Sequence, residues 1–204
     1  MKEYTIVKRE YNENVWENVP KLKIDTFWWV DNGYEPETTA QLCYDDENIY
    51  IKFVVVENEV TARYTKYNDP AWLDSCVEFF LRPVCDKRYF NFEATCIGTL
   101  LLGFGEGRDN RLSVDVDPAI FGFKPSISDP EAFKGPFWTL EYKIPFSFLK
   151  EYWGEFDLKE GLFANCYKCG DETKYEHYGM WNECIKEKPN FHEPKCFGRM
   201  YFEI

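Results

Sequence analysis

The chain has only two histidines among its 204 residues, His177 in KYEHYGMW and His192 in NFHEPK. A hydrolase of the Ser-His-Asp type needs a histidine within reach of its nucleophile, and no Gly-x-Ser-x-Gly turn accompanies either one. Both lie in loop-like segments, where we expect structural or surface roles. The sequence gives no support for this kind of nucleophilic catalysis.

Positive charge is also scarce, since 24 Lys and Arg stand against 36 Asp and Glu, for a formal net charge of -12. Nucleic-acid binding relies on clustered Lys and Arg that neutralise phosphates, and an anionic membrane surface attracts the same residues. We therefore expect neither nucleic acid nor a membrane as a partner.

Long apolar runs are missing too. No segment approaches the roughly 20 apolar residues that cross a bilayer, and residues 1–16 lack the apolar region of a signal peptide, so we expect no export signal. Internal repeats and low-complexity linkers are absent as well. One domain spanning residues 1–204 is predicted, because this length is sufficient for a single core.

Helical periodicity is limited to a turn at SFLKEYW after Pro145, whereas a period of two dominates after residue 38. The strand-like runs are TAQLCY, NIYIKFVVVE, DSCVEFFLRP, RYFNFEAT, FWTLEYKIPF, GLFANCYKC and FGRMYFEI. Many short strands without alternating helices predict an all-β fold, an antiparallel β-sandwich that is jelly-roll-like with long loops.

Two of these runs carry carboxylates on one face. In DSCVEFFL, Glu78 points away from Val77 and Phe79, and in YFNFEATC the polar set includes Asn91 and Glu93. If the runs pair through the PVCDK turn, one face becomes core and the other carries a patch of carboxylates and amides. A solvated outer face is the plain interpretation of such a patch, and a binding surface is the alternative.

The segment 103–134 is rich in Gly, Pro and Asp and shows little strand pattern. Long excursions of this kind are usually functional or mobile. Its GFGEG has no strand-turn-helix context and no following Lys-Ser/Thr, so it does not predict a phosphate-binding loop.

The eight cysteines fall partly inside strand-like runs, where they are typical of small buried hydrophobic residues. Reduced thiols favour a cytoplasmic location. Zinc binding by Cys166, Cys169, Cys184 and Cys196 is disfavoured, because the later spacings match no common motif and the first two cysteines would point to opposite faces of a strand.

No cofactor is expected, and a structural calcium ion is kept open only as an alternative. Its weak candidate ligands are the turn acids Asp45, Asp46 and Asp69, which offer hard oxygen ligands without the spacing of an EF-hand.

Aromatic residues are abundant, at 19% of the chain. A pyranose ring has apolar faces and a polar rim, so a sugar site combines a flat indole with hydrogen-bonding groups at the edge. Trp72 with Glu78 forms one such set in NDPAWLDSCVEFFL, and Trp181 with Asn182 forms another. Core or rim packing of each tryptophan is the alternative.

Several segments, taken in order, resemble the family 9 carbohydrate-binding modules, in particular the family-9-like proteins of Bacteroidetes. They are LCYDDENIYIKFVV, NDPAWLDSCVEFFL, YFNFEATCIGT, IPFSFL, FANCYKCGD and the terminal W…PNFHEPKCFGRMYF. The resemblance runs from about residue 38 to the end, and W-x-D-S-x-V-E-x-F is its distinctive part. It implies a β-sandwich that binds xylan- or cellulose-type sugars in a slot between two tryptophans.

Carried onto this chain, the resemblance makes Trp72 and Trp181 the two walls of the slot and Glu78 the acceptor at its edge. Planar bidentate groups suit sugar hydroxyls. The further candidates for hydroxyl contacts are Asn91, Arg108, Arg111, Asn165 and Asn182.

The predicted function is non-covalent binding of a mono- or oligosaccharide, without turnover. Two alternatives stay open: a glycoside hydrolase or lyase that uses acids of the segment 103–134, and a β-sandwich that binds a partner protein. The sequence leaves open which sugar is bound and whether the chain forms oligomers.

Overall fold

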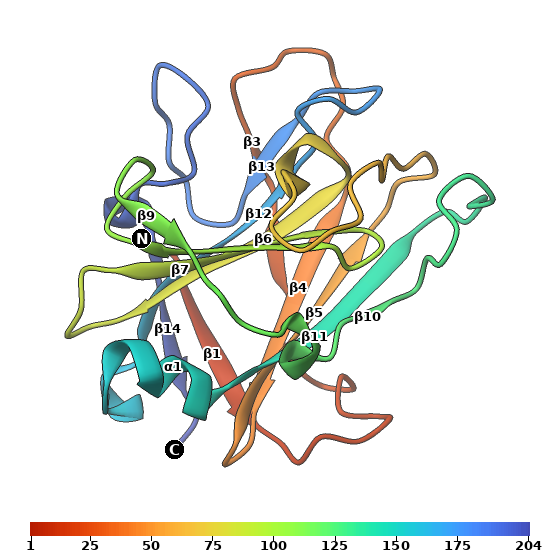
Figure 1. Cartoon of the computed structure of the whole chain (residues 1–204). Coiled ribbons are helices and arrows are strands. Elements are labelled where there is room, and N and C mark those ends of the chain that lie inside the picture. Colours follow the sequence, from red (N-terminus) through yellow and green to blue (C-terminus); the bar gives the residue numbers. More distant parts are fainter.

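The computed structural model describes all 204 residues, and its elements are almost entirely β-strands (Figure 1). It confirms the expected strands as β4 (Thr38–Tyr44), β5 (Asn48–Val55), β6 (Cys76–Pro83), β7 (Tyr89–Thr95), β11 (Trp138–Pro145), β12 (Leu162–Cys169) and β14 (Gly198–Phe202). The helical turn is also confirmed, as α1 (Phe146–Trp153). No helix is long and apolar enough to cross a membrane.

The structure adds strands that the alternation pattern did not reveal. They are β1 (Glu3–Lys8), β2 (Leu22–Ile24), β3 (Thr26–Phe27), β8 (Leu100–Gly105), β9 (Arg111–Ser113), β10 (Lys124–Pro125) and β13 (Tyr178–Met180). Most have only two or three residues, which is too short to show a period of two. The segment 103–134 therefore holds more regular structure than its composition indicated.

The strands form one mixed sheet in the order β10-β11-β5-β4-β1-β14-β12-β6-β7-β8-β9. The N-terminal strand β1 pairs in parallel with both of its neighbours, β14 and β4. The expectation of a purely antiparallel sandwich is therefore wrong, although the all-β class is confirmed. The jelly-roll-like detail stays a prediction.

The sheet curls so that β4, β5 and β11 cross over β6, β7 and β12 (Figure 1). A core of 37 buried residues fills the space between the two halves. Phe92 of β7 and Tyr142 of β11 meet there, with ring centroids 6.1 Å apart. Burial of large aromatic side chains between two sheet halves is a main source of stability for such a fold.

The strands β6 and β7 pair as expected, with Phe79 opposite Phe92 and Glu78 opposite Glu93. Their apolar face lies in the main core, which confirms the assignment of faces. The opposite face is not solvated, because a second apolar cluster and the segment 181–197 cover much of it. The carboxylate and amide patch is therefore buried, and it forms the floor of a pocket.

Candidate functional site

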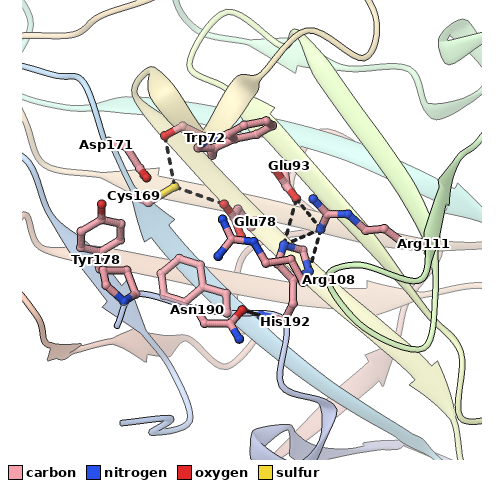
Figure 2. A pocket seen from close by; sticks show the side chains of 12 residues that line it. Trp72, Glu78, Glu93, Arg108, Arg111, Cys169, Asp171, Tyr178, Asn190 and His192 are labelled. Atoms are coloured by element: carbon pink, nitrogen blue, oxygen red, sulfur yellow. Dashed lines mark hydrogen bonds and ion pairs between the residues drawn. The ribbon is translucent and has the colours of Figure 1, made fainter. Parts of the chain in front are cut away.

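A pocket that opens to solvent lies over the polar face of β6, β7 and β12. The short 3₁₀ helix Ala71–Leu73 and the segment after β13 border it (Figure 2). The pocket is lined by Trp72, Glu78, Glu93, Arg108, Arg111, Cys169, Asp171, Tyr178, Pro189, Asn190, Phe191 and His192.

Two buried carboxyl groups form its floor. Glu78 and Glu93 are cross-strand neighbours, and each is only 2% exposed. Burial raises the pKa of Glu93 to about 7, although Arg111 and Asn91 oppose this. Burial and the nearby charge of Glu93 raise the pKa of Glu78 well above its usual range. Two adjacent buried carboxyls resist double ionisation, so the pair holds a proton to higher pH than an isolated carboxyl would.

The two oxygens of Glu78 have different surroundings. Oε1 accepts a hydrogen bond from Sγ of Cys169 at 3.1 Å. Oε2 is buried and has no hydrogen-bond partner within the protein. An unpaired buried polar atom is costly, and this oxygen is the one such side-chain atom among the residues that line the pocket.

Glu93 belongs to a polar network on the other side of the floor. It accepts a hydrogen bond from Nδ2 of Asn91 at 2.8 Å, and Nη1 of Arg111 lies 3.6 Å from its Oε1. The same Nη1 lies 2.7 Å from Nδ1 of His192. Burial, Arg111 and Arg108 lower the pKa of His192 to about 2, so the ring is neutral and can accept from the guanidinium.

Two further charges line the pocket. The side chain of Arg108, from the turn between β8 and β9, points toward Glu78 and His192 (Figure 2). Asp171 follows β12, and burial raises its pKa to about 6. Its backbone amide donates to the carbonyl oxygen of Trp72 at 3.1 Å, which ties the end of β12 to the 3₁₀ helix.

Trp72 lies half-buried at the pocket edge, with its indole beside the polar floor (Figure 2). The aromatic residues nearest to the other edge are Tyr178 and Phe191. Phe191 stacks on Tyr167 at 4.1 Å between ring centroids, and its ring lies 6.2 Å from that of Tyr178. The pocket therefore has an indole on one side and a packed aromatic group on the other.

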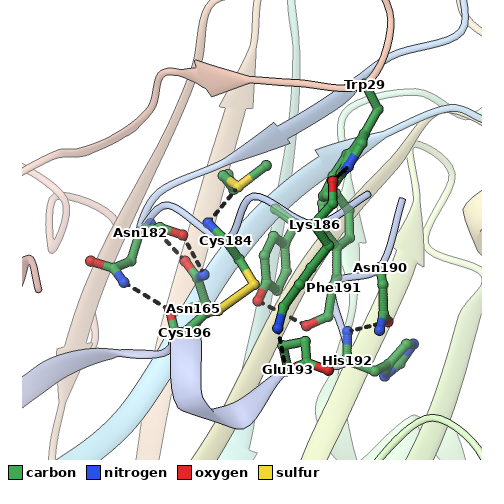
Figure 3. Close-up of a disulfide and its surroundings, with 12 residues drawn as sticks. Trp29, Asn165, Asn182, Cys184, Lys186, Asn190, Phe191, His192, Glu193 and Cys196 are labelled. Atoms are coloured by element: carbon green, nitrogen blue, oxygen red, sulfur yellow. Dashed lines mark hydrogen bonds and ion pairs between the residues drawn. A yellow bond between two sulfur atoms is a disulfide. The ribbon is translucent and has the colours of Figure 1, made fainter. Parts of the chain in front are cut away.

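A disulfide between Cys184 and Cys196 closes the segment that carries Asn190, Phe191 and His192 (Figure 3). Nε1 of Trp29 donates to the carbonyl oxygen of Lys186 at 2.8 Å and so ties this segment to the chain that follows β3. The expectation of reduced thiols is wrong for this pair of cysteines.

Of the sequence candidates, the structure brings Trp72, Glu78, Arg108 and Arg111 together in one pocket. Asn91 lies directly behind them, fully buried, and contacts the pocket only through Glu93. It therefore supports a floor residue and does not face a ligand.

Trp181 lies elsewhere. It is 4% exposed, belongs to the main core and packs so closely on Gly198 that a Cβ there would meet the indole at 2.6 Å. It does not line the pocket, so the structure does not place it opposite Trp72. The reason is that its side chain falls on the core side of the sheet, where a large apolar ring is well accommodated.

Asn165 and Asn182 are also structural. The side chain of Asn165 donates to the carbonyl oxygen of Asn182 at 2.8 Å and accepts from its backbone amide at 2.9 Å. The side chain of Asn182 donates to the carbonyl oxygen of Cys196 at 2.7 Å. These bonds anchor the base of the disulfide-closed segment and leave neither amide in the pocket.

Some pocket residues were not among the sequence candidates. Glu93 could have been found, because the period of two places it on the same face as Glu78. Asp171, Tyr178, Asn190, Phe191 and His192 come from segments without regular pattern. His192 had been assigned a structural or surface role, and only the fold shows that it reaches β7.

The turn acids proposed for calcium are engaged in local contacts. Asp45 accepts from the backbone amides of Glu47 and Asn48, Asp46 pairs with Lys8, and Asp69 accepts from the amide of Lys66. The cysteines considered for zinc are separated, since Cys184 and Cys196 bond to each other and Cys166 lies in the main core.

Comparison with known proteins agrees with the fold and with the motifs. The family model of carbohydrate-binding family 9 matches residues 12–202. The chain belongs to this family. No curated protein matches its sequence.

Solved structures include several similar to this family 9 chain. A candidate carbohydrate-binding protein from Bacteroides uniformis ATCC 8492 has a TM-score of 0.86 and 27% identity, with 99% of each chain covered. A family 9 module from Caldicellulosiruptor kristjanssonii, in complex with glucose, has a TM-score of 0.66 and 12% identity, covering 99% of this chain and 96% of that one. The complex of such a module with cellotriose has a TM-score of 0.65 and 12% identity, covering 99% of this chain and 94% of that one.

Proposed function

We propose that the pocket over β6, β7 and β12 binds a mono- or oligosaccharide non-covalently. The observation that carries this proposal is the indole of Trp72 beside a buried floor whose Glu78 Oε2 lacks a partner. An indole covers the apolar face of a sugar ring, and an unmet polar atom gains a hydrogen bond when a hydroxyl arrives.

The polar groups divide into complementary roles. The carboxyl of Glu78 accepts hydrogen bonds and, when it carries a proton, also donates one, whereas Arg108 and Arg111 only donate. Sugar hydroxyls are both donors and acceptors, so these groups can satisfy one edge of a ring. Asn91 and His192 hold Glu93 and Arg111 in place and thereby orient that edge.

The second wall is proposed to be Tyr178 and Phe191, in place of Trp181. Both line the pocket, and Phe191 is held by its stack on Tyr167. The glucose and cellotriose complexes of the Caldicellulosiruptor module support glucans as the first ligands to test. Xylan-type oligosaccharides remain in the proposal as related β-linked chains.

Turnover is not part of the proposal. One observation favours a glycan hydrolase as the second candidate: Glu78 and Glu93 are paired carboxyls, and the pKa of Glu93 is raised to about 7. Glycosidases, however, place their carboxyls on either side of the scissile bond. Here both rise from neighbouring positions of one floor, and Asn91 engages Glu93. Family membership also favours binding without catalysis.

The test is calorimetric titration with glucose, cellobiose, cellotriose and xylobiose in buffer that contains EDTA. Wild type is compared with Trp72→Ala and with Trp28→Ala, whose indole is 46% exposed and lies outside the pocket. We expect saturable binding of at least one sugar, lost in Trp72→Ala and retained in Trp28→Ala. Equal affinities in the two variants would contradict the site.

Two controls separate the alternatives. Release of reducing ends from cellotriose or xylobiose would favour the hydrolase. If no sugar binds, light scattering and crosslinking would show whether the pocket face instead meets a protein.

A further inference from the structure

Three soft or acidic side chains meet at the base of the pocket, where Glu78 and Cys169 line it and Cys76 lies next to them. A sulfur of Cys76, a sulfur of Cys169 and a carboxylate oxygen of Glu78 all lie within 4.8 Å of one another. All three residues are buried. Cys76 and Cys169 are direct cross-strand partners on β6 and β12, and Glu78 is two positions further along β6, on the same face. The grouping is therefore set by strand register.

The distances suit a metal ion. In a tetrahedral site with metal–sulfur bonds of about 2.3 Å and metal–oxygen bonds of about 2.1 Å, ligand atoms are about 3.6 to 3.8 Å apart. Sγ of Cys169 lies 3.1 Å from Oε1 of Glu78, and the whole group stays within 4.8 Å. Side-chain movements of less than an ångström or so would bring the donors to bonding distance.

A second observation, independent of this grouping, also indicates a missing ligand. Oε2 of Glu78 is buried without a hydrogen-bond partner, on a side chain that is 2% exposed and lines the pocket. A buried oxygen without a hydrogen-bond partner is uncommon in a native structure, and a bound ion is one of the common reasons for it.

We propose that Cys76, Cys169 and Glu78 bind a divalent ion of the zinc class, with a fourth position open toward the pocket. Two thiolates and a carboxylate are donors that Zn²⁺ accepts, and three protein ligands leave one position for water or another oxygen. Hard ions such as Ca²⁺ and Mg²⁺ are excluded from the proposal, because they avoid sulfur.

The charges balance. In the metal-free state the two thiols and the Glu78 carboxyl are neutral, because all three side chains are buried and burial disfavours the charged form. Binding forms two metal–sulfur bonds and one metal–oxygen bond and releases three protons to the buffer. The resulting site has a charge of -1, and Arg108 and Arg111 in the same pocket offset it.

The remaining free cysteines lie outside this group. Cys166 faces the main core, and Cys85 is exposed in the turn between β6 and β7. Cys85 therefore serves as a matched control, because it offers a thiol without partners.

The experiment uses the whole chain, without sugar, and Cd²⁺ as probe, because its bonds to thiolates absorb in the ultraviolet. Wild type, Cys76→Ser, Cys169→Ser, Glu78→Gln and Cys85→Ser are titrated after circular dichroism has shown that each is folded. We expect one Cd²⁺ per chain in wild type and in Cys85→Ser. Each change of a ligand should lower the affinity more than about tenfold, since even indirect partners of a metal site are worth 10- to 100-fold.

Two results of these titrations would rule out the metal site. An unchanged cadmium–thiolate band in both Cys76→Ser and Cys169→Ser would overturn the proposal, and so would a mass showing these two cysteines joined as a disulfide. If a serine variant does not fold, the Cd²⁺ affinity of Glu78→Gln tests the proposal, and an affinity equal to that of wild type would overturn it. Displacement of Cd²⁺ by Zn²⁺, with a heat that depends on the buffer's ionisation enthalpy, would support zinc and the proton release. The sugar titrations contain EDTA, so failure here leaves the proposed function standing.

Discussion

Glu78 and Glu93 face each other across β6 and β7, and both carboxyls are almost completely buried. Two adjacent buried carboxyls do not both ionise easily. The floor of the pocket is therefore polar but carries less negative charge than two separate glutamates would. Glu93 is satisfied by Asn91 and Arg111, whereas Glu78 has one oxygen without a partner. Oδ1 of Asn91 is also buried without a partner, but of these two residues only Glu78 lines the pocket.

A first prediction follows from the burial of Glu78, which raises its pKa and favours the neutral carboxyl. Glu78→Gln keeps one donor and one acceptor in place, so sugar affinity should change by less than about threefold, while Glu78→Leu should lose about 1 to 3 kcal/mol of binding free energy. Calorimetry with the best sugar checks this. A large loss in Glu78→Gln would show instead that an ionised carboxylate is required. Glu78→Gln also removes the negative charge of a proposed metal ligand. It should therefore weaken Cd²⁺ binding much more than it changes sugar binding.

The two tryptophans should behave in opposite ways. Trp72→Ala removes a half-buried ring from the pocket and should abolish most sugar binding with little loss of stability. Trp181→Ala empties a site in the core and should lower the free energy of unfolding by about 3 to 5 kcal/mol. Urea unfolding of both variants, with Trp28→Ala as control, measures this. Similar stability losses in the two would contradict the assignment of Trp181 to the core.

The position of the two carboxyls could be predicted from the sequence, but their burial could not. Alternation placed Glu78 and Glu93 on one face, and the pairing of β6 with β7 followed from a short turn. The burial of that face did not follow, because it depends on the segment 181–197 folding back across the sheet. Register and loop path are set by tertiary contacts, which a local pattern does not encode.

Parallel pairing was missed for a similar reason. β1 lies between β4 and β14, which are far from it in sequence, and only closure of the whole sheet brings them together. His192 illustrates the same limit in the site. Its partner Arg111 is 81 residues away, and nothing in NFHEPK indicates the contact.

The disulfide should matter for both stability and binding. It closes the segment that carries Asn190, Phe191 and His192, and a covalent loop of this size contributes about 2 to 3 kcal/mol. Replacing Cys184 and Cys196 together by Ser should lower the midpoint of thermal unfolding and weaken sugar binding several-fold. Cys85→Ser is the control. Unchanged binding in the double variant would show that Trp29 and the asparagine contacts alone hold the segment.

On the face of β12 opposite to the pocket residue Cys169, Lys168 is fully buried and pairs with Glu57, whose oxygens also accept from Trp138 and Tyr34. Glu57→Gln should destabilise the chain by about 3 to 5 kcal/mol, because it leaves a buried ammonium without its counter-charge. The double variant Lys168→Met with Glu57→Gln should recover part of that loss. Chemical denaturation measures both. Full additivity of the two changes would show that the pair is not coupled.

The last prediction concerns pH and His177, which is 2% exposed. Nε2 lies 2.7 Å from Nζ of Lys168, and Nδ1 lies 2.6 Å from the carbonyl oxygen of Tyr175, so the neutral ring accepts from the ammonium and donates to the carbonyl. Burial and the charge of Lys168 lower the pKa of His177 to about 3.

The unfolded chain binds a proton at His177 below about pH 6.5, while the folded chain does so only near pH 3. Stability should therefore fall as pH falls through this window, by up to about 1.4 kcal/mol per pH unit from this residue. His177→Gln, whose amide can make both hydrogen bonds, removes that contribution. Urea unfolding at pH 7, 6 and 5 should show a shallower decline in the variant than in wild type. Parallel declines would mean that His177 is charged in the fold, and the buried cluster with Lys168 would then need a second counter-charge besides Glu57.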